Sequence, residues 1–207
     1  FFKKSLIKDW RNGMRHTVPV SATFNVFNYI NITPSLNITD RMYTNRVDRA
    51  WDADRNIETC DTTYGFYNVY DFMASVAMDT KLYGFYQPLG FLGKKIKMIR
   101  HVITPSISFN GAPDFGSSFF GYYGSYTYTD SRGMEQVKKY SRFPNALFGV
   151  PGQGKTGSMS FSLSNNLEMK VVSESDSTGE KKISLIENLN ISESYNFAAD
   201  SLRWSDI

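Results

Sequence analysis

Long apolar runs are missing from this sequence. No stretch approaches the roughly 18 consecutive apolar residues that a membrane-spanning helix needs, so the chain either stays out of a membrane or crosses it as strands. A leader with a basic end, an apolar centre and a small-residue cleavage site is also missing, and the sequence opens at Phe1-Phe2-Lys3 without an initiator Met. We therefore expect the chain to be a piece of a longer mature protein.

Cysteine and histidine are scarce, which weakens the case for most catalytic and metal-binding chemistry. Cys60 is the single cysteine, so we expect no disulfide within the chain and no metal cluster, although a partner cysteine outside it stays an alternative. His16 and His101 have no evident nucleophile or metal-ligand pattern beside them. The net charge of +3 is too balanced to suggest nucleic acid as a partner. We expect no catalytic, cofactor-binding or metal site, and no enzyme.

Apolar and polar residues alternate with a period of two over six long runs. Between Ser158 and Lys170, for example, every even position is polar and most odd positions are apolar. Successive side chains of a strand point to opposite faces, so this pattern predicts strands. The runs reach roughly 10 to 17 residues, whereas globular strands usually have about 5–6. They span residues 17–27, 30–39, 66–82, 99–110, 157–171 and 183–197.

The polar face of these strands separates two kinds of all-β protein. A face turned to bulk water usually carries many charges, but here it is mostly Ser, Thr and Asn, as expected for a crowded, hydrated lumen, with the apolar face toward lipid. We therefore predict an all-β fold, an antiparallel transmembrane β-barrel of which the chain is a fragment, with residues 1–207 inside one barrel domain. The candidate lumen-lining residues are Thr33, Ser35, Asn37, Ser106, Ser108, Ser158, Ser160, Ser162, Ser164, Asn188, Asn190 and Ser192.

Some residues do not fit the alternation. Glu187, Glu193 and His101 fall on the apolar face, and Asn165 interrupts the apolar series. Two explanations stay open: a β-bulge that shifts the phase, or a position near the membrane interface, where carboxylates cost less. Prolines 19, 34 and 105 lie inside predicted strands, where they favour edges, bulges and weak points of pairing.

Short and long connections broadly alternate, as in outer-membrane barrels. The connection near Asn28-Tyr29 is very short, while 44–64 and 111–156 are long, and we expect both long ones outside the cell; 84–97 is intermediate, and the side of 172–182 stays open. Within 111–156, Asp130-Ser131-Arg132-Gly133 predicts a turn between two strands. Aromatic residues at 83–86 suggest a membrane girdle, and those at 119–123 suggest either a girdle or loop packing.

Residues 149–156 fit the pattern of a phosphate-binding P-loop, G-x-x-x-x-G-K-[ST]. That motif needs a helix directly after the Lys-Thr pair, because the helix N-terminus faces the phosphates. The following residues, Gly157 to Ser164, are poor in helix formers and alternate with period two. We therefore interpret the segment as a Gly-rich loop that leads into a strand.

Three segments carry a resemblance to a known family. Ile99-Arg100-His101-Val102-Ile103-Thr104-Pro105 with Ala112-Pro113-Asp114-Phe115, and Phe148-Gly149-Val150-Pro151-Gly152-Gln153-Gly154-Lys155-Thr156, resemble the barrel of the LptD (OstA-type) lipopolysaccharide-assembly proteins, as does Ser194 to Trp204. The resemblance implies a translocon in the outer membrane of Gram-negative bacteria that inserts lipopolysaccharide into the outer leaflet. It also implies contact with outer-membrane lipids, an LptE-like lipoprotein plug and an LptA-like periplasmic bridge. No lateral-gate residue of the family maps onto this chain.

Other functions stay open at this point. One alternative is another outer-membrane barrel, such as a porin or a TonB-dependent transporter, which the complete gene would reveal through its further domains. A second is a structural or adhesive surface barrel whose long loops bind partner proteins. A soluble nucleotide-binding enzyme ranks last, because it depends on the P-loop pattern alone.

Overall fold

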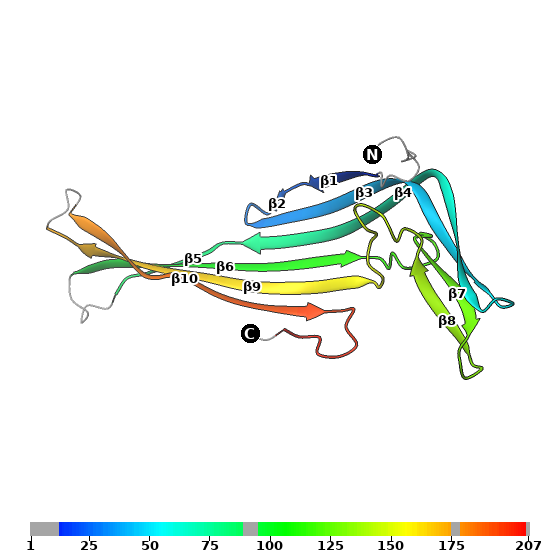
Figure 1. Ribbon diagram of the computed structural model, residues 1–207. Helices are drawn as coiled ribbons and strands as arrows, with labels where there is room; N and C mark the ends of the chain where they lie inside the picture. Colours follow the sequence, from blue (N-terminus) through cyan, green and yellow to red (C-terminus); the bar gives the residue numbers. More distant parts are fainter. Residues whose placement is uncertain (1–12, 89–94, 175–178, 206–207) are drawn as a thin grey trace. The chain divides into compact units, whose positions relative to one another are not determined.

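The computed structural model describes residues 13–88, 95–174 and 179–205, and these residues form an antiparallel all-β protein without helices (Figure 1). Parts of the predicted connections 84–97 and 172–182 lie outside the described residues. The strands are β1 (Gly13–Ser21), β2 (Phe24–Val26), β3 (Ile30–Asp52), β4 (Ile57–Thr80), β5 (Leu82–Tyr86), β6 (Ile96–Ala112), β7 (Tyr123–Thr129), β8 (Glu135–Ser141), β9 (Thr156–Val172) and β10 (Glu180–Asn196).

Two sheets account for all these strands. The larger follows the order β1-β3-β4-β6-β9-β10, with β2 also paired to β3 and β5 to β6, while β7 and β8 form a separate hairpin. Apart from that hairpin, neighbours in the larger sheet follow one another along the chain. The larger sheet therefore has the up-and-down topology of a meander. In the part of the chain that the structure describes, β1 and β10 are not paired with each other, so the sheet is open and does not close into a barrel.

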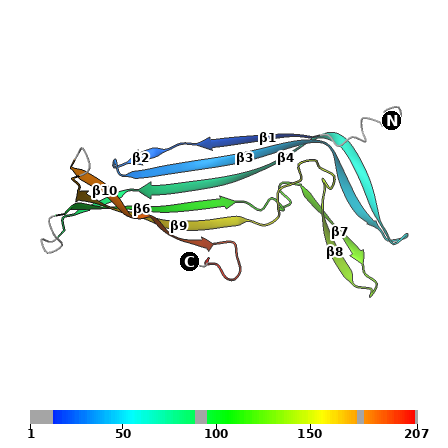
Figure 2. The same ribbon diagram turned by 60° about the vertical axis from the view of Figure 1, so that its left-hand side comes forward.

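Contacts divide the described chain into two compact units. Unit 1 comprises residues 13–20, 36–73 and 112–156, and unit 2 comprises residues 21–35, 74–111 and 157–205. Figure 2 shows the β7–β8 hairpin of unit 1, and it also shows β6 and β9 of unit 2 running side by side. The polar strand face predicted from the sequence belongs almost entirely to unit 2.

All six predicted runs lie in strands, although the run 17–27 divides into β1 and β2 and the run 66–82 into β4 and β5. The segment 44–64, in contrast, differs from the expected long connection. Strand β3 continues to Asp52 and β4 begins at Ile57, so only a short turn remains between them. Asp52 Oδ1 accepts the backbone N–H groups of Asp54 and Arg55, both at 3.1 Å, and Asn56 has a φ of +54°. The charges that suggested a loop are paired, as Arg49 is with Glu58 at 2.5 Å. Paired charges are compatible with a strand outside lipid.

Two of the three prolines, Pro34 and Pro105, mark breaks in the pairing, as predicted, whereas Pro19 lies within β1. Strand β4 pairs with β6 up to Asp79 opposite Ser106, and β5 takes over from Leu82 opposite Ile103, so Pro105 lies at the change of partner. Pro34 likewise lies opposite the gap between β1 and β2, where its carbonyl accepts the N–H of Ala22 at 3.2 Å. Proline donates no hydrogen bond to a neighbouring strand, which explains why the ladders end there.

Unit 1 has a small aromatic core. Its buried residues are Tyr43, Val69, Phe115, Tyr122 and Phe143. The hydroxyl of Tyr122 donates to the carbonyl of Tyr70 and accepts the N–H of the same residue, both at 2.9 Å, so the phenol satisfies β4 backbone where a strand would otherwise pair. Phe120, Tyr122 and Tyr123 therefore pack in unit 1, which was one of the two explanations open for the rings at 119–123, whereas Phe119 is 84% exposed.

The β7–β8 hairpin confirms the prediction of a turn at Asp130 to Gly133 between two strands. Tyr123 pairs with Ser141 and Thr129 with Glu135, and Asp130 Oδ1 accepts the N–H groups of Arg132 and Met134 in the turn. Gly133 follows with a φ of +80°, a conformation that glycine adopts without strain.

Candidate functional site

The polar face of unit 2 is built by the register of its long strands. In the β9–β10 pair, Ser158, Ser160, Ser162 and Ser164 lie opposite Asn196, Ser194, Ser192 and Asn190. Residues opposite one another in an antiparallel pair share a face, so this face carries two facing rows of hydroxyl and amide groups. Figure 1 shows β9 between β6 and β10, so the rows extend onto both neighbours.

Side-chain hydrogen bonds cross from strand to strand on this face. Ser162 Oγ donates to Asn190 Oδ1 at 2.8 Å, and Ser164 Oγ donates to Asn188 Oδ1 at 2.9 Å. On the other side of β9, Ser158 Oγ donates to Asn110 Oδ1 of β6 at 2.8 Å. The strands β6, β9 and β10 thus present one hydrogen-bonded surface of neutral groups.

The same kind of contact continues on the first strands. Ser35 Oγ and Ser75 Oγ lie 2.6 Å apart between β3 and β4, and Thr33 Oγ1 lies 3.1 Å from Thr23 Oγ1. Asn31 donates to Asp79 Oδ2 at 3.1 Å. The partners Ser75 and Asp79 were not among the candidates, although the alternation that placed Val76 and Met78 on the apolar face puts them on the polar one.

The structure brings eleven of the twelve candidates together in unit 2. Ser106 and Ser108 pair with Asp79 and Ala77, positions that continue the polar rows. Asn37 belongs to unit 1, where it is exposed on β3, and is the one candidate outside this group. The eleven are Thr33, Ser35, Ser106, Ser108, Ser158, Ser160, Ser162, Ser164, Asn188, Asn190 and Ser192. That they line a lumen stays a prediction.

The opposite face of unit 2 leaves large apolar side chains uncovered. Phe161 is 44% exposed, Ile191 46% and Leu189 49%, and Ile191 pairs with Leu163 on this face. Such an uncovered apolar surface is unusual on a protein surrounded by water.

Two of the misfits on the apolar face contact each other. His101 Nε2 lies 3.3 Å from Asn165 Oδ1, between β6 and β9. Glu187 falls in a stretch of β10 with register shifts on both sides of Ile186, so a bulge accounts for its phase. Glu193 keeps its place on the apolar face, opposite Phe161. A bulge thus explains Glu187, while a position of Glu193 near the membrane interface stays a prediction.

A charged cluster binds the β7–β8 hairpin to the β3–β4 turn region in unit 1. Glu58 accepts hydrogen bonds from Arg49 at 2.5 Å, Tyr126 at 2.8 Å and Lys138 at 2.8 Å. These three donors, Lys138 above all, lower the pKa of Glu58 from its usual 4.5 to about 2. Trp51 and Tyr128 add ring contacts, with centroids 5.6 Å apart. The arrangement is that of a structural clamp.

The P-loop-like segment leads into strand β9, which begins at Thr156, as its interpretation as a loop requires. The N–H of Gly154, which a phosphate would need, donates instead to Asp114 Oδ1 at 2.6 Å. A carboxylate at this position repels a phosphate, so the segment does not fit a nucleotide.

Residues 13–88, 95–174 and 179–205 contain neither a candidate membrane-spanning helix nor a candidate metal site. No helix there combines the length and the apolar character needed to cross a membrane. No group of three or more His, Cys, Asp or Glu side chains there is placed to hold a metal ion.

Comparison with known proteins gives one match. The family model described as "LptD protein" matches residues 1–207, the whole sequence. No curated protein and no solved structure matches the chain. LptD proteins act in transport and assembly, in agreement with the resemblance noted in the sequence. The chain therefore belongs to the LptD protein family.

Proposed function

We propose that this chain is an arc of an outer-membrane β-barrel that transports lipopolysaccharide and inserts it into the outer leaflet. The observation that carries the proposal is the separation of the two faces of unit 2, one a hydrogen-bonded surface of Ser, Thr and Asn and the other an uncovered apolar surface. On this proposal the apolar face contacts lipid and the polar face lines the lumen.

The neutral chemistry of the polar face suits a sugar-rich substrate. Hydroxyl and amide groups donate and accept, as sugar hydroxyls do, and several are already hydrogen-bonded to a neighbour, as Ser162 is to Asn190. Exchanging one neutral hydrogen bond for another costs little, so a sugar chain would pass without being trapped. A lumen with many unpaired charges would hold the phosphorylated substrate more tightly.

Family membership and strand order together support an orientation. Antiparallel strands alternate in direction, so the connection between β6 and β9 and the turn between β3 and β4 share a side, which we place outside the cell. The connections β5–β6 and β9–β10 then face the periplasm. There we expect the LptA-like bridge, with the LptE-like lipoprotein plug inside the complete barrel.

The test replaces a polar-face serine with a charged residue in the full-length protein. Ser162→Asp is expected to reduce lipopolysaccharide at the cell surface while the amount of folded barrel stays near normal, because the strand pairing uses backbone groups that the substitution leaves intact. Ser162→Thr is the matched control, since it keeps the hydroxyl. Equal loss of folded barrel and of surface lipopolysaccharide in Ser162→Asp would contradict a role for the polar face in transport.

Depletion of the whole protein separates this function from the alternatives. Loss of surface lipopolysaccharide is expected of a translocon. Intact surface lipopolysaccharide, with lost uptake of a small solute or lost adhesion, would instead indicate a porin, a TonB-dependent transporter or an adhesive barrel.

A further inference from the structure

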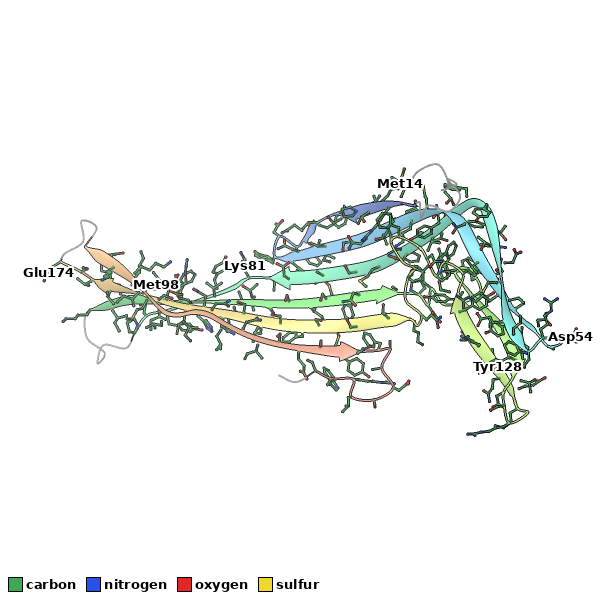
Figure 3. All side chains as sticks on the ribbon, viewed as in Figure 1. Met14, Asp54, Lys81, Met98, Tyr128 and Glu174 are labelled. Carbon is green, nitrogen blue, oxygen red and sulfur yellow. The ribbon has the colours of Figure 1, made fainter. Side chains whose placement is uncertain are left out.

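Positive charges gather at one end of the polar face of unit 2. Lys97 and Arg100 come from the start of β6, Lys170 from the end of β9 and Lys182 from the start of β10. Two carboxylates, Glu168 and Glu180, lie among them, so this basic cluster of four cations and two anions has a net charge of +2. Figure 3 labels Met98, which lies between Lys97 and Arg100 in β6, and Lys81.

Each carboxylate holds two cations. Glu168 receives Arg100 at 2.5 Å on one oxygen and Lys182 at 2.6 Å on the other. Glu180 receives Lys97 at 2.7 Å and Lys170 at 3.0 Å in the same way. The Glu168 side chain is only 14% exposed, whereas Arg100 and Lys182 are 42% and 57% exposed. The carboxylates therefore lie beneath the cations and position them, and the positive groups face outward.

Lys170 and Lys182 lie directly opposite each other in the β9–β10 pair. Like charges in this position destabilise a sheet, typically by a few tenths of a kcal/mol to about 1 kcal/mol. The carboxylates relieve this repulsion only in part, because each of them shares its charge between two cations. An anion bound across the pair would relieve the remainder.

Two adjoining hollows receive this charge. The first, of about 380 Å³, is lined by three cations (Arg100, Lys170 and Lys182), by Glu168 and by the apolar side chains of Phe85, Met98 and Met169. The second, of about 370 Å³, shares Arg100 and Glu168 and adds Lys81 with the polar groups of Tyr83, Thr104 and Asn166. Both are within the size range of small-molecule sites. The side chain of Phe85 shares a face with Arg100 and lines the first hollow, while the membrane girdle expected at 83–86 stays a prediction.

We propose that this basic cluster binds a phosphate monoester on the head group of a glycolipid. Arg100, Lys170 and Lys182 supply charge-assisted hydrogen bonds to the phosphate, and the apolar wall contacts the start of an acyl chain. The polar groups of the second hollow face the sugar that carries the phosphate. The proposal rests on the proposed transport function and adds that the substrate is first held by its phosphate, at the strand ends that we place on the periplasmic side.

The deciding variant is Lys170→Gln with Lys182→Gln in the full-length protein. It removes two cations but leaves Arg100 on Glu168 and Lys97 on Glu180, so no carboxylate loses both partners. The matched control is Lys181→Gln, because Lys181 pairs with Val171 and lies on the opposite face of the same strand. Folding of each protein is checked by the difference in gel migration between unheated and heated samples.

Binding is measured with purified lipopolysaccharide, with the same material after enzymatic dephosphorylation, and with inorganic phosphate. We expect the double variant to bind intact lipopolysaccharide roughly tenfold or more weakly, as the loss of contacts to a charged group predicts, while the control binds normally. We also expect dephosphorylation to weaken binding to the native protein and to have little effect on the double variant. Added salt should weaken the binding of intact lipopolysaccharide to the native protein more than any other binding in this series.

Three outcomes would overturn the proposal. They are equal binding of intact and dephosphorylated material, an equal loss in Lys181→Gln, and binding of inorganic phosphate as tight as that of the lipid, which would assign the cluster to a free anion. The transport function survives each of them if depletion still removes surface lipopolysaccharide. Conversely, phosphate-dependent binding without any effect of depletion on surface lipopolysaccharide would retain the anion site and reject the transport function.

Discussion

At the scale of single residues, tyrosine hydroxyls form hydrogen bonds with backbone groups that a neighbouring strand would usually pair. Tyr122 satisfies both backbone groups of Tyr70, and Tyr43 and Tyr123 donate to the carbonyls of Gly149 and Pro151, each at 2.6 Å. These bonds hold residues 112–156 of unit 1 together and attach them to β3 and β4. A buried phenol usually finds such a partner, since leaving the backbone groups unpaired is costly.

The hydroxyl of Tyr122 provides the first prediction. Tyr122→Phe leaves the N–H and the carbonyl of Tyr70 without this partner and is expected to cost about 1–3 kcal/mol, measured as a lower midpoint of urea unfolding of the full-length protein. Tyr64→Phe, at an exposed position on β4, is the control and should change the midpoint little. An unchanged midpoint in Tyr122→Phe would show that water replaces the phenol.

The low pKa of Glu58 gives a prediction about acid. Because the folded-state pKa of about 2 lies below the ordinary 4.5, the clamp stabilises the fold fully above about pH 4.5 and loses this contribution as the pH falls toward 2. Backbone hydrogen exchange over residues 123–141 should therefore accelerate, beyond the intrinsic rate, as the pH falls across that window. Glu58→Gln should show fast exchange already at pH 6, and Glu135→Gln, on exposed β8, should resemble the native protein.

At the scale of elements, turn chemistry and register decide where the strands end. The β3–β4 turn depends on Asp52 as a side-chain acceptor and on Asn56 in a left-handed conformation. At the other end of the chain, Ser205 donates to the carbonyl of Ser194 at 2.8 Å, and Trp204 forms a bridge with Tyr195. The last described residues thus pair with part of the free edge of β10, an edge that would otherwise offer unpaired groups.

Asn56 allows a test of this turn. Asn56→Val places a β-branched residue at a φ of +54° and is expected to cost roughly 1–2 kcal/mol, which lowers both the unfolding midpoint and the fraction of folded barrel. Asn56→Gly should be neutral or slightly stabilising, because glycine adopts positive φ freely. If valine and glycine behave alike, the turn conformation is not what limits assembly.

At the scale of the whole molecule, the division of unit 2 into two faces is the property that links fold to function. On the proposed function the apolar face contacts lipid, where a charge costs about 2–4 kcal/mol near the centre of the membrane, while the same charge in a hydrated lumen costs little. Neighbouring residues on one strand belong to opposite faces, so the two environments can be compared by the same substitution at adjacent positions.

Ile191 and Asn190 make that comparison. Ile191→Arg, on the apolar face opposite Leu163, is expected to prevent most of the protein from assembling in the membrane. Asn190→Arg, on the polar face opposite Ser164, is expected to assemble normally. The amount of heat-modifiable barrel in isolated membranes is the measurement. Normal assembly of Ile191→Arg, or equal failure of both variants, would reject lipid contact by the apolar face.

Period two by itself determined the class of the fold, the six long strands and the two faces, because each successive side chain of a strand must point to the opposite side. Eleven of the twelve polar candidates lie in unit 2, with Asn37 alone outside it, and their role in a lumen stays a prediction. The sequence misled at 44–64, where charge looked like a loop. A charged segment can be recognised as a strand only when the partners of its charges are known. Arg49 pairs with Glu58 across the β3–β4 turn, which the local composition does not indicate.

Tertiary structure decided whatever depends on register. Only the pairing of strands shows that His101 contacts Asn165, that Phe85 lines a hollow with Arg100, and that Lys170 and Lys182 lie opposite each other. The physical reason is distance along the chain: these contacts join strands whose alignment is set by prolines, bulges and connections far from the residues concerned. A sequence pattern gives the face of each strand, but a site needs the alignment between strands.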